Sequence, residues 1–206
     1  MRLAISTATE ALSVAWWHHD GSLGAEFHEV IGRGHAERLL PTIAELLGGR
    51  RATHIAVDVG PGSFTGVRVG VAAARGLGIG WGANVSGFSG AALLAVAAVG
   101  TGRAGAGAAV AIRAGHGEVF WQMFARPPGS TSDIDSLGPV CSLVPELAAA
   151  EVGGLTVVGT GADLVVPGAA PAWPRAVHWP LLPPALRALP PRPLYVRAPD
   201  ARLSAA

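Results

Sequence analysis

One glycine-rich run constrains what this chain can fold into more than any other feature. It reads Val59-Gly60-Pro61-Gly62-Ser63-Phe64-Thr65-Gly66-Val67-Arg68. A phosphate loop needs the order G-x-x-x-x-G-K-[ST], but here the second glycine is followed by Ser63, and all fifteen basic residues of the sequence are arginine. Lysine-dependent chemistry, including Walker loops, kinase lysines and Schiff bases, is therefore excluded. The run predicts a turn that starts a helix.

Apolar periodicity predicts alternating strands and helices around this turn. Strands are expected at 3–6, 11–18, 23–30, 53–59 and 84–88, and helices at 35–47, 65–80 and 89–99. A hairpin at 108–113 and 118–125 restarts the scheme, followed by a helix at 144–151 and a strand at 156–159. Three antiparallel strands extended by strand–helix units indicate an α/β fold. The order resembles the duplicated ribonuclease-H-like fold of the actin, sugar-kinase and Hsp70 ATPases, with an abbreviated second half.

Low complexity at 100–107 marks the expected boundary between two domains. We predict an N-terminal actin-like ATPase-type domain over 1–102 and a smaller, degenerate C-terminal domain over 103–206. The second domain carries a proline-rich tail at 180–193. Such a tail is expected to cover a surface rather than to build a core.

Charge is scarce and unevenly placed. The net charge of +1 is too small to predict nucleic-acid binding, yet no acidic residue occurs between Val59 and Gly117, where four arginines lie. Two interpretations stay open, namely buried elements that need no charge, or a surface for an anionic partner.

Cysteine usage and the N-terminus indicate the cytoplasm. Cys141 is the sole cysteine, which excludes an intramolecular disulfide and a cysteine-based zinc cluster and fits a reducing compartment. The first residues lack the order of a signal peptide, and the apolar stretch 85–99 is too short and too broken for a membrane span. We expect a cytoplasmic protein without a membrane contact.

Four motifs carry a resemblance to a known family. They are Leu3-Ala4-Ile5-Ser6-Thr7-Ala8-Thr9-Glu10, Arg33-Gly34-His35-Ala36-Glu37-Arg38-Leu39-Leu40-Pro41, the run from Gly60 to Arg68, and Pro193-Leu194-Tyr195-Val196-Arg197. In this order they resemble the TsaB (YeaZ) family. The resemblance implies a role in making threonylcarbamoyladenosine beside the anticodon of tRNAs that read codons beginning with A. It also implies a non-catalytic heterodimer partner of the transferase TsaD, on which the ATPase TsaE acts.

Two positions support a non-catalytic interpretation. The ATPases of this fold end their first strand in an Asp near Mg²⁺, and TsaB proteins usually retain it, but this chain has Ser6. The resemblance also implies that TsaD carries a His-x-x-x-His metal pair on its first helix, whereas the corresponding helix here has His35 with Leu39 four residues on. We therefore expect no metal site and no cofactor, although a nucleotide at the heterodimer boundary stays open. Contact with tRNA is expected only through the complex.

The helix after the glycine-rich run has a face of small residues. Gly66, Gly70 and Ala74 recur every four residues, which lets another element approach closely. This face packs either on the domain's own sheet or in a helix bundle with TsaD or a second copy of the chain. The resemblance favours the bundle, with these partner-binding residues: His35, Arg38, Leu39, Pro41, Thr65, Arg68, Val69 and Gly70.

The sequence also leaves an enzymatic alternative open. Ser89 lies between a predicted strand and a predicted helix, and Asp163 and His178 follow in the chain order of a hydrolase triad. The nucleophile motif G-x-S-x-G fails at Ala91, and a serine at this junction is also a good N-cap. The alternative function is an independent serine hydrolase or nucleotide phosphatase that uses Ser89.

Overall fold

The computed structural model describes residues 1–130 and 133–197, which form two mixed sheets with helices around them. The first sheet has the order β3-β2-β1-β4-β5. Its strands are β1 (Arg2–Ser6), β2 (Ala11–Trp17), β3 (Leu23–Val30), β4 (His54–Asp58) and β5 (Asn84–Phe88). β1, β2 and β3 pair antiparallel, while β4 lies parallel to both β1 and β5.

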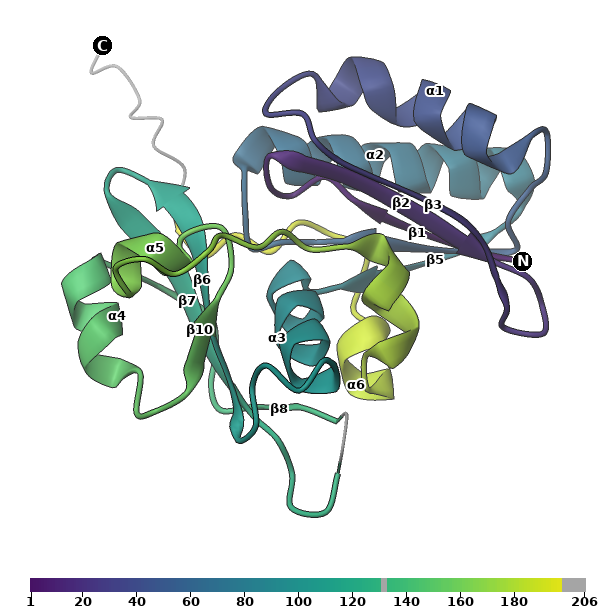
Figure 1. Ribbon diagram of the computed structural model, residues 1–206. Helices are drawn as coiled ribbons and strands as arrows, with labels where there is room; N and C mark the ends of the chain where they lie inside the picture. Colours follow the sequence, from purple (N-terminus) through teal and green to yellow (C-terminus); the bar gives the residue numbers. More distant parts are fainter. Residues whose placement is uncertain (131–132, 198–206) are drawn as a thin grey trace, which may run out of the picture.

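Helices cover both faces of the first sheet (Figure 1). α1 (His35–Leu47) and α2 (Phe64–Trp81) pack on one face, against Leu3 and Ile5 among others. α3 (Gly90–Gly100) packs on the opposite face, which Ala4 and Ala56 present. No helix within residues 1–130 and 133–197 has the length and apolar character needed to cross a lipid bilayer.

The second sheet has the order β10-β6-β7-β8, and β9 also pairs with β7. Its strands are β6 (Gly107–Gly115), β7 (Glu118–Ala125), β8 (Asp135–Ser136), β9 (Cys141–Leu143) and β10 (Thr156–Val158). α4 (Pro145–Glu151) and α5 (Ala162–Val165) pack on this sheet. We call the first sheet with α1 and α2 the first lobe, and the second sheet with α4 and α5 the second lobe.

α3 lies between the two lobes and joins their cores. Residues of α3 cluster with β1, β2 and β4 on one side and with β6 and β7 on the other. The predicted α/β architecture is confirmed, and the bounds of the predicted elements differ from the structure by at most two residues. The division into domains at residue 102 stays a prediction.

The C-terminal part of the chain returns to the first lobe. The 3-10 helix η1 (Ala176–Leu181) and α6 (Pro184–Arg187) follow β10 and α5 in the chain. Trp179 is 3% exposed and Leu182 is 2% exposed, and both belong to the core around α3. The prediction that the tail 180–193 only covers a surface is therefore wrong for Leu182. Burying an apolar side chain stabilises the folded state even where prolines flank it.

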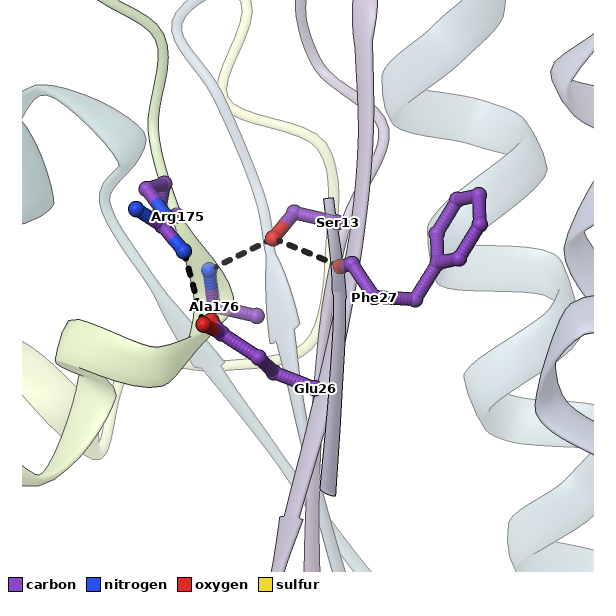
Figure 2. A network of polar contacts seen from close by, with 5 residues as sticks. All are labelled: Ser13, Glu26, Phe27, Arg175 and Ala176. Carbon is purple, nitrogen blue, oxygen red and sulfur yellow. Dashed lines mark hydrogen bonds and ion pairs between the residues drawn. The ribbon is translucent and has the colours of Figure 1, made fainter. Parts of the chain in front are cut away.

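A polar network attaches the start of η1 to β2 and β3 (Figure 2). The Ser13 hydroxyl accepts a hydrogen bond from the Ala176 N–H at 2.9 Å and donates one to the Phe27 carbonyl at 3.4 Å. Beside it, Arg175 Nη2 lies 2.7 Å from Glu26 Oε1. The Phe27 ring points to the other face, toward the α1–α2 side. The alternation of β3 thus separates a polar contact from an apolar one.

Candidate functional site

The glycine-rich run is a turn packed on the end of the β1–β2 connection. A Cβ atom at Gly62 would overlap the carbonyl oxygen of Ala8, and one at Gly66 would overlap the carbonyl oxygen of Thr7. Gly60 has a φ of 104°, in the left-handed region that glycine tolerates. Glycine is therefore required here by a close backbone approach and by backbone conformation.

Three backbone donors of this turn are engaged within the protein. The Gly60 N–H donates to Asp58 Oδ1 at 2.9 Å, the Ser63 N–H donates to the Ala8 carbonyl at 2.7 Å, and the Gly66 N–H donates to Ser63 Oγ at 3.3 Å. Ser63 is the N-cap of α2. A phosphate cradle needs free N–H groups that point at the anion. The turn thus starts a helix, as its sequence predicts.

Asp58 is the buried polar centre of this region. Its side chain is fully buried at the end of β4, where Oδ2 accepts a hydrogen bond from Ser6 Oγ at 2.7 Å. Oδ1 accepts from the N–H groups of Gly60 and Gly90, at 2.9 and 3.0 Å. Burial raises the pKa of the Asp58 carboxyl to about 7, against the opposing effect of these three hydrogen bonds.

The Asp58 carboxyl joins β1, the glycine-rich turn and the start of α3. A Cβ atom at Gly90 would lie 2.5 Å from Asp58 Oδ2, so the helix begins directly against the carboxyl group. Asp58 was not among the predicted site residues, although an acidic residue that ends an otherwise apolar strand is a signal for a buried polar site. Among the described residues, no three His, Cys, Asp or Glu side chains gather in a group that could hold a metal ion.

The small-residue face of α2 packs on the protein's own sheet. Gly66, Gly70, Ala74 and Gly78 are all buried. A Cβ atom at Gly70 would lie 2.5 Å from Thr7 Oγ1 and 3.4 Å from Val57 Cγ2. The interpretation in which this face meets another protein is therefore corrected, and Gly70 is not available to a partner.

The opposite side of α2 and the outer side of α1 are exposed, and the charged side chains there are Glu37, Glu45, Arg68 and Arg75. Ile79 on α2 is 86% exposed and Leu40 on α1 is 49% exposed. Between the helices, a groove of about 370 Å³ is lined by Ile43, Leu77 and Trp81 among others, with Arg50 and Arg51 at one end. We call the following exposed residues the helical face: Ala36, Leu40, Pro41, Ala44, Thr65, Arg68, Ala72, Arg75, Gly76 and Ile79.

Some predicted partner-binding residues lie on this face and others do not. Pro41, Thr65 and Arg68 are exposed, and His35 and Val69 are half-buried. Leu39 is 1% exposed and belongs to the core under α1, so its prediction as a partner contact is corrected. Leu40 and Ile79, which are exposed on this face, were not among the predicted partner-binding residues.

Arg38 is engaged on its own chain. Its two terminal nitrogens bind the two carboxylate oxygens of Glu29 on β3, at 2.9 and 2.7 Å. The Arg38 guanidinium also lies 5.8 Å from the centroid of the Phe27 ring. A partner group that binds Arg38 would have to compete with this two-point ion pair.

A cleft of about 1270 Å³ lies between the two lobes. The start of α1 and the start of α2 line one side, and the β6–β7 hairpin lines the other. The rings of Phe64 and Tyr195 contact each other at its edge, tilted by 40° with centroids 5.2 Å apart, and the Arg68 guanidinium lies 3.8 Å from the Phe64 centroid. The charged lining is mixed, because arginines and glutamates both contribute to it.

Comparison with known proteins identifies the family. A family model described as the tRNA N6-adenosine threonylcarbamoyltransferase TsaD matches residues 27–148. A solved Pseudomonas aeruginosa structure, described as similar to the peptidase YeaZ, shares 30% identity with a TM-score of 0.75, covering 95% of this chain and 99% of that one. The structure of YeaZ from the same organism shares 29% identity with a TM-score of 0.74, covering 94% and 98%. The chain belongs to the TsaB/YeaZ family.

Curated relatives agree with this family. The tRNA threonylcarbamoyladenosine biosynthesis protein TsaB of Escherichia coli is 43% identical over 129 residues, which are 60% of this chain and 54% of that protein. The Haemophilus influenzae protein of the same name is 42% identical over 80 residues, 36% of this chain and 33% of that one. The matches thus span about half and a third of these two proteins. The two sheets of this TsaB/YeaZ family member form an actin-like, ribonuclease-H-like fold.

The three residues of the candidate hydrolase triad lie in different parts of this TsaB/YeaZ family member. Ser89 is the N-cap of α3, where its hydroxyl accepts from the Ala92 N–H at 3.4 Å. Asp163 on α5 lies 2.6 Å from Arg113 Nη2, in the second lobe. His178 on η1 interacts with His28, Arg175 and Glu26 at the β3 side of the first lobe. A triad needs the nucleophile, the base and the acid within hydrogen-bond reach of one another, and this arrangement does not provide it.

Proposed function

We propose that this chain acts in tRNA threonylcarbamoyladenosine biosynthesis as the non-catalytic partner of a TsaD-type transferase. The pair is a heterodimer, on which the ATPase TsaE acts. Contact with tRNA is made through the complex. Supporting this are the curated relatives, which are named for that biosynthesis, and the transferase family model that matches more than half of the chain.

The observation that carries the proposal is the unpartnered helical face on α1 and α2. Large apolar side chains such as Ile79 and Leu40 are exposed there beside small residues, and two arginines are the charged members of the face. Such a surface favours close contact with another helical surface, because it buries apolar area at little cost in side-chain entropy. A second copy of the chain would use the same face, so a homodimer competes with the heterodimer.

The face is tested by Ile79→Arg, measured by titration of the purified chain with a TsaD homologue. Burying an unpaired guanidinium in an apolar contact weakens binding, and we expect the dissociation constant to rise about tenfold or more. Modification of tRNA by the reconstituted TsaD and TsaE proteins should fall in parallel at limiting concentrations of the variant.

The matched control is Leu147→Arg. Leu147 is a 57% exposed leucine on α4 of the second lobe, away from the helical face. It introduces the same charge and should leave both binding and modification unchanged. If Ile79→Arg bound TsaD like the wild type, or if both variants lost affinity equally, the helical face would not be the binding surface. Failure of the wild-type chain to bind TsaD at all would contradict the proposed function.

We further propose that this chain alone holds no cofactor and that a nucleotide binds only where the two proteins meet. Equilibrium dialysis with labelled ATP tests this, first with the chain alone and then with the complex. Binding to the isolated chain at the same affinity would overturn it.

The enzymatic alternative is tested separately. If the isolated chain had a hydrolytic activity and Ser89→Ala removed it, the alternative would be supported.

A further inference from the structure

The segment 187–197 crosses from the first lobe to the second, and it begins on the free edge of the first sheet. The Leu189 N–H donates to the Gly87 carbonyl at 2.9 Å, and the Gly87 N–H donates to the Leu189 carbonyl at 2.6 Å. β5 is the outer strand of that sheet, so this bridge pairs an otherwise open edge. A Cβ atom at Gly87 would lie 2.7 Å from the Pro190 carbonyl oxygen and 3.2 Å from that of Leu189, and it would also lie 2.7 Å from Val59 Cγ1 in the first lobe. The edge is therefore shaped for this segment.

The middle of the segment passes over the glycine-rich turn. The Leu194 N–H donates to the Val59 carbonyl at 2.8 Å. Three prolines, Pro190, Pro191 and Pro193, fix φ over this stretch and reduce the conformational entropy lost when it docks. The stretch is therefore less flexible than a loop of the same length without prolines.

The end of the segment is attached to the second lobe. Arg197 Nη1 lies 3.0 Å from Glu118 Oε2, and Nη2 donates to the Ala114 carbonyl. The same guanidinium lies 5.5 Å from the centroid of the Phe120 ring. Two residues before it, the Tyr195 ring contacts the Phe64 ring at the start of α2 in the first lobe. Side chains two positions apart thus contact opposite lobes.

The four residues Leu194 to Arg197 all line the cleft between the lobes. We propose that residues 187–197 form an interlobe strap, whose docking fixes the orientation of the second lobe and hence the width of the cleft. α3 supplies the shared core about which the lobes can turn, and the strap closes the cleft side. This inference concerns the isolated chain and does not depend on the proposed partner.

Tyr195 is the sole tyrosine of the sequence, so 3-fluorotyrosine gives a single fluorine NMR line from the strap. In the wild-type chain we expect this line to be displaced from its position in the denatured chain, because of the ring current of Phe64. Gly87→Ala, which crowds the first anchor, should move the line at least half of the way back. Gly138→Ala is the matched control, since a Cβ atom there meets nothing within 4 Å, and it should leave the line in place.

Orientation is measured by the distance between spin labels on Glu37→Cys in α1 and Leu147→Cys in α4, with Cys141→Ser as background. We expect a narrow distribution of the distance between the two labels when the strap has its wild-type sequence, and a broader distribution in Gly87→Ala. Arg197→Gln, which removes the ion pair with Glu118, should also broaden it even if Gly87→Ala fails to fold. An unchanged distance distribution in Arg197→Gln, or a fluorine line that stays at its wild-type position in a folded Gly87→Ala, would overturn the proposal.

Discussion

α2 and α3 are built from similar sequences and yet have different environments. Both follow a strand of the first sheet, both are capped by a serine hydroxyl, and neither contains an acidic residue. Nine of the eleven residues of α3 are buried, whereas α2 buries one side and exposes Ile79 at 86%. The difference arises because α3 lies between two sheets and α2 covers only one. An acid-free, small-residue helix therefore does not by itself indicate an interface.

The largest expected effect is the difference between α3 and α2 in how much a truncated side chain lowers the free energy of unfolding. Leu93 on α3 is fully buried, so Leu93→Ala should lower the free energy of unfolding by about 2–5 kcal/mol through lost burial and a cavity. Ile79→Ala on α2 should change it by less than about 0.5 kcal/mol. Urea titration of both variants measures the difference. Equal losses would mean that the exposed side of α2 is packed in the isolated chain.

The next effect concerns Asp58, which holds the start of α3. Its folded pKa of about 7 lies above the ordinary value of 3.8, so its contribution to stability is fully present below pH 3.8 and is lost as the pH rises through 7. Between pH 5 and pH 8 this amounts to about 2–3 kcal/mol of unfolding free energy.

Asp58→Asn should remove this pH dependence. The amide oxygen can still accept from the two N–H groups, and the amide nitrogen can donate to Ser6 Oγ. Denaturation at pH 5 and pH 8 should therefore show a wild-type loss that the variant lacks. A variant with the same pH dependence as the wild type would contradict the role of Asp58.

A glycine pair within α2 distinguishes its two sides. Gly66→Ala should lower the free energy of unfolding by about 1–3 kcal/mol, because the new Cβ atom overlaps the Thr7 carbonyl oxygen. Gly76→Ala, which meets nothing within 4 Å, should raise it by about 0.5–1 kcal/mol through helix propensity. Thermal unfolding of the isolated variants measures both. A stabilised Gly66→Ala would mean that the buried side is wrongly assigned.

The smallest effect concerns the contact of η1 with β3. Burial, followed by the Arg175 guanidinium, lowers the pKa of both His28 and His178, and Glu26 opposes this. Their folded pKa values lie below 6.5, so their contribution to stability is present above that pH and is lost as the pH falls. In an Asp58→Asn background, the melting temperature should fall between pH 7 and pH 5. The double variant His28→Gln and His178→Gln should fall less, and an equal fall would contradict the assignment.

Local signals predicted the elements well. Apolar periodicity located α1, and the glycine pair at its end supplies the left-handed C-cap at Gly48. The strand bounds 23–30 and 84–88 follow from alternation and flanking turns. The short strands β8 and β9 and the helix η1 were not predicted, because their stability comes from contacts with distant segments rather than from local periodicity.

The candidate site was predicted less completely. The glycine-rich run was correctly interpreted as a helix-starting turn, but Leu39 and Gly70 were placed on the surface, and Leu40 and Ile79 were missed. A helix with apolar or small residues on several sides does not reveal which side faces its sheet. Asp58 was missed because its partners Ser6 and Gly90 are distant in the sequence.

The sequence by itself determined the order of strands and helices, the turn chemistry of the glycine-rich run and the family motifs, because these depend on local backbone preferences and residue spacing. Only the tertiary structure decided which side of α2 is free, that α3 is enclosed, and that residues 187–197 join the two lobes. The physical reason is that burial depends on what packs against an element, and in this chain those neighbours come from distant parts of the sequence.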